Sequence, residues 1–233
     1  MNMTLFVPGR GEHLAAAARM LAQYHRAASG FRRNALESSG AMYHPSVVQA
    51  SLDHLVRAWR LHGAPELEAP VRLLREHVAE LKQRFAAHGR LPCVVIHGDY
   101  YADNLLFEGD RIIGVVDYDK ARWQARVAEV AEAVIYFGSP RPGNLSFLVY
   151  PGCLCRDPVV QFLSAYGHET DVTEQEALAL PDYIRAIWIS VSCQQLAERR
   201  VPECAAAALP EVVALADWSR DQAGFLTASV PTG

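Results

Sequence analysis

The sequence predicts an α+β domain that is mostly helical, with one short β-ribbon in the middle of the chain. Three observations indicate this fold class. Apolar residues recur at helical spacing through most of the first ninety residues, residues 91–121 hold short β-rich runs separated by turn residues, and helical patterns return after residue 122. Hydrophobic residues make up 51% of the 233-residue chain, which is enough to build a core.

The first part of the chain is expected to consist of three amphipathic helices. The first runs from Glu12 to Gly30, the second from Val47 to Leu61, and the third from Glu66 to His88. A glycine stands at or soon after the end of each, as is common where helices end. In each helix apolar residues repeat every three or four positions, which gives one face for a core.

Short apolar runs mark the middle of the chain. LPCVVI (91–96) and LLF (105–107) have β-forming compositions, and EGD (108–110) separates LLF from RIIGVVDY (111–118). A turn of this length between two apolar runs predicts an antiparallel hairpin. We therefore expect a small ribbon, and a polar loop before it, set into an otherwise helical domain.

The remaining residues are expected to be helical again. Helices are predicted over 127–137, 157–166, 183–200 and 203–220, and the Pro- and Gly-rich stretch 138–152 is predicted to be a loop. Thr173 and Glu176 have the spacing of a capping box, which predicts the start of a further helix. Pro181 is expected to interrupt that helix, because proline lacks the backbone N–H that a helix interior needs.

Composition excludes several classes of protein. A net charge of −4 and a pI of about 6.1 provide no basic surface for nucleic acid. No apolar run is long enough for a membrane span, and the N-terminus has no secretory pattern. The five cysteines show neither a disulfide framework nor zinc-finger spacing, so we expect reduced thiols and a cytoplasmic protein.

One polar segment suggests chemistry. HGDYYADN (97–104) precedes the LLF strand, and Asp117 follows the next apolar run. A loop carboxylate such as Asp99 can accept a proton from a substrate hydroxyl. The amide of Asn104 and the carboxylate of Asp117 are hard oxygen ligands that suit Mg²⁺, which implies a nucleotide or a phosphorylated substrate. His97 would then hold the loop through hydrogen bonds to backbone.

The same residues also admit a purely structural interpretation. Asp99 and Asn104 are common turn formers, and Asp117 is of a type that often caps a turn. For any one residue this interpretation is favoured, but it is not favoured for the joint pattern H-x-D-x-x-x-x-N, strand pair, V-V-D. Tyr100 and Tyr101 either line a substrate pocket or simply pack, with equal weight.

HGDYYADNLLF followed by GVVDYDKA resembles the catalytic loop and metal-binding strand of the aminoglycoside phosphotransferase and choline kinase-like family. This family includes type II homoserine kinases and shares the protein kinase fold. The resemblance implies that Asp99 is the catalytic base and that His97 supports its loop. It further implies that Asn104 and Asp117 hold Mg²⁺ on ATP. Glu129 stands where the family usually has an aspartate that braces the loop.

The early helix HLAAAARMLAQYHRA also resembles the family segment that follows the hinge between the two kinase lobes. By this resemblance, residues 1–233 form a single C-terminal lobe, with helices over 12–90, the catalytic loop and metal-binding ribbon over 91–121, and a helical substrate-side region over 122–233. The family's strand-rich N-terminal lobe, with its glycine-rich loop and phosphate-binding lysine, has no counterpart in the sequence.

Three explanations for the missing lobe are open. The chain is a truncated kinase, which we favour, or a one-lobe protein that binds a ligand, or the partner of an N-terminal lobe on another polypeptide. In each case the uncovered side of the ribbon is expected to be apolar and to be covered by a second copy or by a separate lobe.

We expect an ATP- and magnesium-dependent phosphotransferase that acts on a hydroxyl of a homoserine-, choline- or aminoglycoside-like molecule. Residues 184–200 hold one acidic residue, Glu198, which favours a small acceptor over a polycationic aminoglycoside. Arg122 and Trp123 are expected to cover a helix start rather than to meet the acceptor. The main alternative is a non-catalytic binding or regulatory module with the same fold, and a metal-dependent phosphoester hydrolase is a weaker one.

Overall fold

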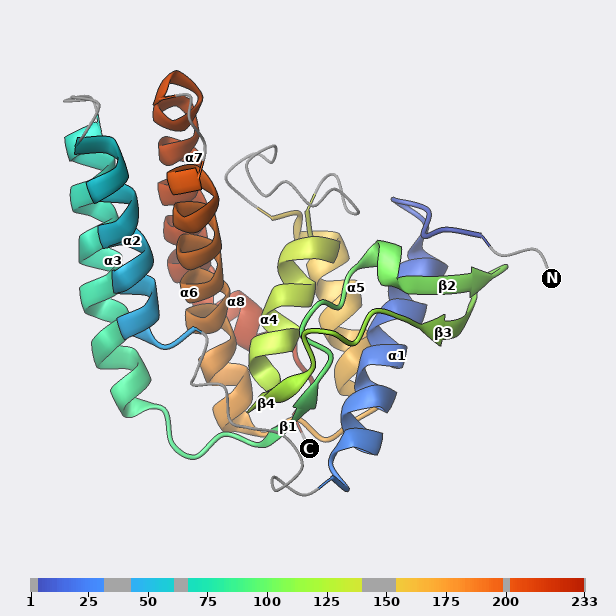
Figure 1. Cartoon of the computed structure of the whole chain (residues 1–233). Helices are drawn as coiled ribbons and strands as arrows, with labels where there is room; N and C mark the ends of the chain where they lie inside the picture. Colours follow the sequence, from blue (N-terminus) through green and yellow to red (C-terminus); the bar gives the residue numbers. More distant parts are fainter. Residues whose placement is uncertain (1–3, 32–42, 61–66, 140–153, 199–201, 233) are drawn as a thin grey trace.

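The computed structural model describes residues 4–31, 43–60, 67–139, 154–198 and 202–232, and these form a mostly helical α+β fold with two small antiparallel sheets. The helices are α1 (Gly11–Ala28), α2 (Pro45–Arg60), α3 (Glu68–Ala87), α4 (Arg126–Phe137), α5 (Arg156–Gly167), α6 (Glu174–Glu198), α7 (Pro202–Asp221) and α8 (Ala223–Ala228). Figure 1 shows α2, α3, α6 and α7 side by side in one group, whereas α1, α4 and α5 accompany the strands.

Most of the predicted helices agree with these bounds to within a few residues, because their apolar faces are regular. The loop predicted over 138–152 lies outside the described residues except for its first two. Helix α6 is central and packs against α2, α3, α4, α7 and α8. Although α6 is long and largely buried, no helix in the described ranges is long and apolar enough to cross a membrane.

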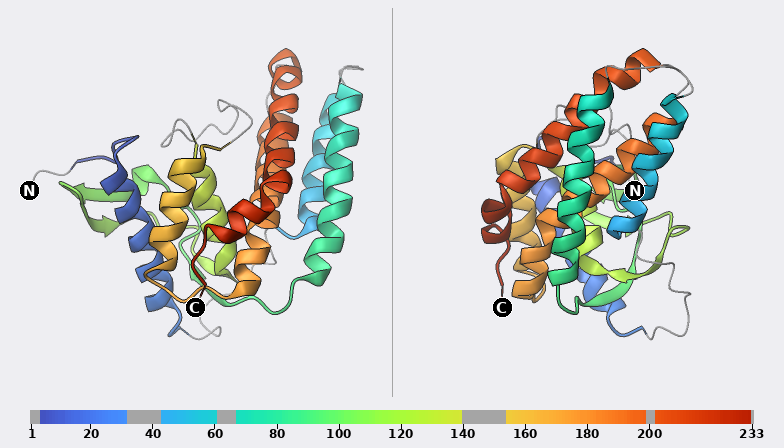
Figure 2. Two further views of the ribbon diagram at one scale, coloured as in Figure 1. Left: turned by 180° about the vertical axis from the view of Figure 1, so that it is seen from behind. Right: turned by 90° about the vertical axis from the view of Figure 1, so that its left-hand side faces the viewer.

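The prediction that Pro181 interrupts a helix is wrong, because α6 continues through it. Proline cannot donate to the carbonyl four residues earlier, which is that of Ala177. The hydroxyl of Thr227, on α8, donates to this carbonyl instead over 3.2 Å. Figure 2 shows α8 and the C-terminal residues close to the first half of α6, so a tertiary contact replaces the lost backbone hydrogen bond.

The start of α6 follows the predicted capping box. The Glu176 N–H donates to Oγ1 of Thr173 over 3.2 Å, and the Thr173 N–H donates to Oε2 of Glu176 over 3.0 Å. Arg126, at the start of α4, also donates from Nε to the Glu176 carboxylate over 2.6 Å. Glu176 therefore caps the start of α6 and also links α6 to the start of α4.

The strands form two separate two-stranded sheets. The predicted hairpin is present as β2 (Leu105–Glu108) and β3 (Arg111–Val115), with a register shift between Leu106 and Phe107. The apolar run before the polar loop forms β1 (Cys93–Ile96), which pairs with β4 (Arg122–Ala125) rather than with the ribbon. Strand β4 was not predicted, since RWQA lacks the β-branched character of its partner.

Pairing of β1 with β4 decides which side chains face the interior next to the polar loop. On β4, Arg122 and Gln124 are buried, whereas Trp123 points to the other face and is half-buried. Trp123 lines a hollow with Phe85 and Tyr183, away from the loop. Arg122 is thereby placed against the loop itself.

Candidate active site

The segment between β1 and β2 carries most of the predicted site. After β1 the chain turns at Gly98, whose φ of +80° lies in the left-handed region. A Cβ atom at this position would lie 2.2 Å from the Lys120 carbonyl oxygen and 2.4 Å from Nη1 of Arg122. Only glycine fits such a position. The loop ends in a short 3₁₀ helix, Ala102–Asn104, which leads directly into β2.

His97 is fully buried and links the loop to the segment that precedes Asp117. Its Nε2 lies 2.9 Å from the Val116 carbonyl oxygen, and the N–H of Asp99 donates to its Nδ1 over 3.2 Å. Because the carbonyl can only accept, the ring proton is on Nε2 and Nδ1 is the acceptor. One neutral imidazole therefore ties the backbone of Asp99 to the backbone next to Asp117.

Asn104 and Asp117, the predicted metal ligands, are also connected through the backbone. Nδ2 of Asn104 donates to the Asp99 carbonyl oxygen over 2.9 Å, and the Val116 N–H donates to the Asn104 carbonyl oxygen over 3.0 Å. Asp117 has a φ of +66°, a conformation that aspartate adopts more readily than most residues. The Asn104 amide nitrogen is thus hydrogen-bonded to the protein. Its Oδ1 remains as a possible metal ligand, together with the exposed carboxylate of Asp117.

This donor set fits magnesium. Mg²⁺ usually takes one or two protein oxygens and completes its coordination shell with water and phosphate oxygens. In the described part of the chain, no three histidine, cysteine, aspartate or glutamate side chains gather so that they could hold a metal ion. An amide oxygen and one carboxylate therefore suit an ion that is held jointly with phosphate groups.

Asp99 forms an ion pair that sequence reasoning missed. Nζ of Lys120 lies 2.9 Å from Oδ2 of Asp99, whose side chain is 15% exposed. The hydrogen bond to Asp99 raises the pKa of Lys120, while partial burial opposes this shift. Lys120 is one of two lysines in the chain and follows Asp117 by three residues, which was the signal that could have found it.

Glu129, on α4, lies beneath the loop and is completely buried. Its two carboxylate oxygens accept from the N–H groups of His97 (3.0 Å) and Gly98 (2.5 Å). Nε2 of His25, on α1, lies 2.8 Å from the same carboxylate, and Nδ1 of His25 lies 2.8 Å from the Tyr166 hydroxyl on α5. Glutamate therefore reaches the loop backbone despite being one methylene longer than aspartate.

The two loop tyrosines have different surroundings. Tyr100 is buried, and its hydroxyl donates to the Ala17 carbonyl oxygen on α1 over 2.7 Å, so it packs. Tyr101 is partly exposed and its ring lies 5.5 Å from that of Tyr136. Partial burial and the nearby charge of Asp99 raise the pKa of Tyr101. Of the two, Tyr101 is the one beside the site.

Three further polar side chains interact with one another, and the charge of Asp99 acts on one of them, Glu132; sequence reasoning did not assign them to the site. Arg122 donates from Nη1 to the Lys120 carbonyl oxygen over 2.9 Å, so it contacts the segment that follows Asp117. Glu132 lies on α4 one turn after Glu129, and Tyr43 precedes α2. Arg122 and Glu132 are each 7% exposed, and Tyr43 is 2% exposed.

These side chains interact electrostatically. Burial, followed by the negative charge of Glu129, raises the pKa of Glu132 to about 8; Asp99 adds to the rise and Arg122 opposes it. Burial and the charge of Glu132, to which Tyr43 is hydrogen-bonded, raise the pKa of Tyr43. The spacing of three residues between Glu129 and Glu132 was the available sequence signal, since it places both on one side of a helix.

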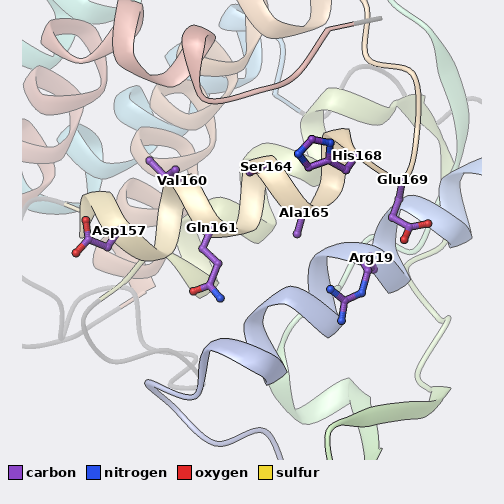
Figure 3. Close-up of a pocket in the computed structure, with 8 residues that line it drawn as sticks. All are labelled: Arg19, Asp157, Val160, Gln161, Ser164, Ala165, His168 and Glu169. Carbon is purple, nitrogen blue, oxygen red and sulfur yellow. The ribbon is translucent and has the colours of Figure 1, made fainter.

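A groove of about 610 Å³ lies elsewhere, between α1 and α5. Figure 3 shows residues that line it, among them Gln161 and Ser164 on α5, His168 directly after α5, and Arg19 on α1. None of the predicted site residues lines it. The candidate active site is therefore defined by the loop and its hydrogen bonds, and not by this groove.

Comparison with known proteins decides the family. The model of the phosphotransferase enzyme family matches residues 4–170, which is more than half of the chain. The chain belongs to this family. The matched region includes the whole loop from His97 to Asn104 as well as Asp117, Glu129 and Glu132. The family resemblance stated from the sequence is thereby confirmed.

Two curated relatives are similar over most of this chain. The homoserine kinase of Methylobacillus flagellatus is 27% identical over 188 residues, which cover 77% of this chain and 50% of the relative. The homoserine kinase of Methylobacillus glycogenes is 27% identical over 198 residues, covering 82% and 54%. The chain thus spans about half the length of the curated relatives it matches.

Solved structures share the fold at low identity. A choline/ethanolamine kinase family protein from Mesorhizobium loti superposes with a TM-score of 0.62 at 14% identity, over 97% of this chain and 69% of that one. An aminoglycoside phosphotransferase from Alicyclobacillus acidocaldarius superposes with a TM-score of 0.58 at 19% identity, over 94% of this chain and 67% of that one. An amicoumacin kinase in complex with AMP-PNP and Ca²⁺ gives 0.57 at 13% identity, over 98% and 64%. The kinase-like fold follows from these matches.

Proposed function

We propose that this phosphotransferase-family chain carries the metal-binding and acceptor side of an ATP-dependent small-molecule kinase. The observation that supports this best is the arrangement of the loop. His97 ties Asp99 to the segment before Asp117, and Asn104 binds the Asp99 backbone, so all three predicted functional groups are held by one hydrogen-bond network. A purely structural turn would not need the carboxylate of Asp117 to be left exposed beside the amide of Asn104.

The proposed roles follow from the chemistry of each group. Asp99 accepts or orients the proton of the acceptor hydroxyl, since its carboxylate is held at the edge of the loop. Asn104 and Asp117 would hold Mg²⁺, which neutralises charge on the phosphates of ATP when it is bound. His97 and Glu129 are positioning residues that fix the loop backbone.

The acceptor in this proposal is a small homoserine-, choline- or aminoglycoside-like molecule with a free hydroxyl. The names of the curated relatives favour homoserine. A cytoplasmic location, where ATP and Mg²⁺ are supplied, remains part of the proposal. So does the expectation that this lobe acts with a nucleotide-binding unit, whether on a longer form of the chain, on a partner polypeptide or across a homo-oligomer.

Thermal stability with Mg²⁺ and ATP tests the proposal, and Asp117→Asn with Asp119→Asn forms a matched pair. Both residues are exposed carboxylates two positions apart, but the first alone is a proposed ligand. A ligand present at a hundred times its dissociation constant raises the free energy of unfolding of the protein by about 2.7 kcal/mol, which raises Tm by several degrees. We expect a shift that needs Mg²⁺, is lost in Asp117→Asn and persists in Asp119→Asn. The metal assignment would be contradicted if the wild type showed no shift, or if the wild type and both variants showed the same shift.

A further inference from the structure

Glu132 and Arg122 are two buried ionisable side chains that the protein leaves incompletely paired. Oε2 of Glu132, and Nε and Nη2 of Arg122, are shielded from solvent and have no hydrogen-bond partner among the described residues. An unpaired buried polar atom destabilises a protein, and more so when the group is charged. Three such atoms in one neighbourhood indicate that something else takes up these bonds.

Both side chains lie near Asp99 and its partner Lys120. The charges of Asp99 and Lys120 act on Glu132, and Arg122 is anchored at the Lys120 carbonyl oxygen next to the loop. Tyr43 is hydrogen-bonded to Glu132 and also senses the charge of Arg122, so these three side chains share one region. Glu132 and Arg122 are therefore candidates to meet the remaining groups of a molecule that presents a hydroxyl to Asp99.

The two groups have complementary preferences. A buried carboxylate forms charge-assisted hydrogen bonds with an ammonium group, and a guanidinium binds a carboxylate through two parallel N–H donors. Nε and Nη2 are adjacent donors of one guanidinium, as such a two-point contact requires. A ligand with one ammonium and one carboxylate group would satisfy all three unpaired atoms together.

We propose that Glu132 and Arg122 recognise the acceptor, and that the acceptor is a zwitterionic amino acid with a hydroxyl in its side chain. The ammonium group binds Oε2 of Glu132, the carboxylate binds Nε and Nη2 of Arg122, and the hydroxyl extends to Asp99. This inference rests on the proposed function, because the role of Asp99 fixes where the hydroxyl lies. The inference favours an amino-acid acceptor over an amino alcohol, because an amino alcohol has no carboxylate to pair with Arg122.

Three probe compounds test the inference in the full chain by calorimetry, without nucleotide. L-Homoserine carries all three groups, 3-aminopropanol lacks the carboxylate, and γ-hydroxybutyrate lacks the amino group. We expect L-homoserine to bind at least about tenfold more tightly than either truncated compound, since each of these lacks one group that forms hydrogen bonds to a charged side chain. Equal affinity for the three compounds, or binding of none of them, would overturn the inference.

Two conservative variants assign each group. Glu132→Gln should weaken the binding of L-homoserine and of 3-aminopropanol by about tenfold or more, and should leave the binding of γ-hydroxybutyrate unchanged. Arg122→Lys should weaken the binding of L-homoserine and of γ-hydroxybutyrate, because lysine lacks the two adjacent N–H donors of a guanidinium. The binding of 3-aminopropanol should be unchanged. Circular dichroism establishes that each variant is folded. Uniform weakening of all three compounds in a folded variant would mean that its side chain is merely structural.

Failure of the inference and failure of the proposed function are distinguishable. The acceptor titrations need no metal or nucleotide, and the Mg²⁺-ATP shift needs no acceptor. A metal-dependent ATP shift together with no preference for L-homoserine would keep the kinase and remove this acceptor class. Selective binding of L-homoserine without any Mg²⁺-ATP shift would keep the amino-acid site and contradict the metal assignment.

Discussion

Glu129 and Glu132 lie one turn apart on α4, and both are buried, yet their surroundings differ. Glu129 meets two backbone N–H groups of the loop and the ring of His25. Glu132 has one oxygen without a partner among the described residues, and its pKa is raised to about 8, first by burial. The same residue type thus serves two regions: a closed network beneath the loop, and an incompletely paired region beside it.

The difference teaches how a helix can support both a fold and a ligand. A carboxylate whose hydrogen bonds are all taken by the protein fixes its neighbours and has nothing left for a ligand. A carboxylate that keeps a free oxygen in a buried place lowers the stability of the protein, and binding of a cation relieves that penalty. Variants of each region should therefore change stability in opposite directions.

The largest effect is expected from Gly98→Ala in the closed network. The new Cβ would meet the Lys120 carbonyl oxygen at 2.2 Å, and the backbone has a φ of +80°. We expect a loss of about 3–5 kcal/mol, measured by urea unfolding. Gly109→Ala is a matched control, since its φ is +61° but no atom lies within 4 Å of the added carbon. Equal losses in both would mean that backbone conformation alone matters.

Glu129→Gln should have the next largest effect. The amide nitrogen cannot accept from the N–H groups that now bind both carboxylate oxygens, so one donor of His97, Gly98 or His25 is left unpaired. We expect a loss of about 2–4 kcal/mol at pH 7, which lowers Tm by roughly 4–16 °C in a chain of this size. A variant as stable as the wild type would show that the loop does not depend on this carboxylate.

Glu132→Gln is expected to stabilise the free protein, and more so as pH rises. The pKa of Glu132 is about 8 in the folded protein and near 4.5 when unfolded, so between these values only the unfolded chain has released the proton. Wild-type stability therefore falls from pH 4.5 to 8, and the Gln variant lacks this loss.

Unfolding of both proteins at pH 6 and pH 8.5 measures the effect. We expect the advantage of the Gln variant to reach about 2–5 kcal/mol at the higher pH, with saturating L-homoserine reducing it. The groups that act on Glu132 are identical in both proteins: Glu129, Arg122, Asp99, Lys120 and Tyr43. If the difference in the free energy of unfolding between the two proteins were the same at both pH values, the prediction that the Glu132 carboxyl titrates in this range would be wrong.

The smallest effect on stability is expected from Lys120→Met. The ion pair with Asp99 is short, but the lysine side chain is 61% exposed, so solvent screens the interaction. We expect a change of less than about 1 kcal/mol in the free energy of unfolding. A larger loss, measured by urea unfolding beside Lys82→Met as a surface control, would show that Lys120 belongs to the closed network.

Much of the site could be predicted because its pattern is local in sequence. His97, Asp99 and Asn104 lie within eight residues, and their loop is bounded by recognisable apolar runs. The contacts of His97 with backbone were expected and are present. Lys120, Arg122 and Glu132 were not assigned to the site, because spacing from Asp117 or Glu129 does not by itself show which distant groups a side chain meets.

What the sequence by itself determined are features whose causes lie within a few residues. These are the amphipathic helices, the hairpin of β2 and β3, and the capping box of Thr173, since each depends on periodicity or on short-range hydrogen bonds. Tertiary structure alone decided the pairing of β1 with β4, the continuity of α6 through Pro181, and the meeting of Asp99 with Lys120. Each needs a partner that is distant in sequence, and only the packed chain supplies it.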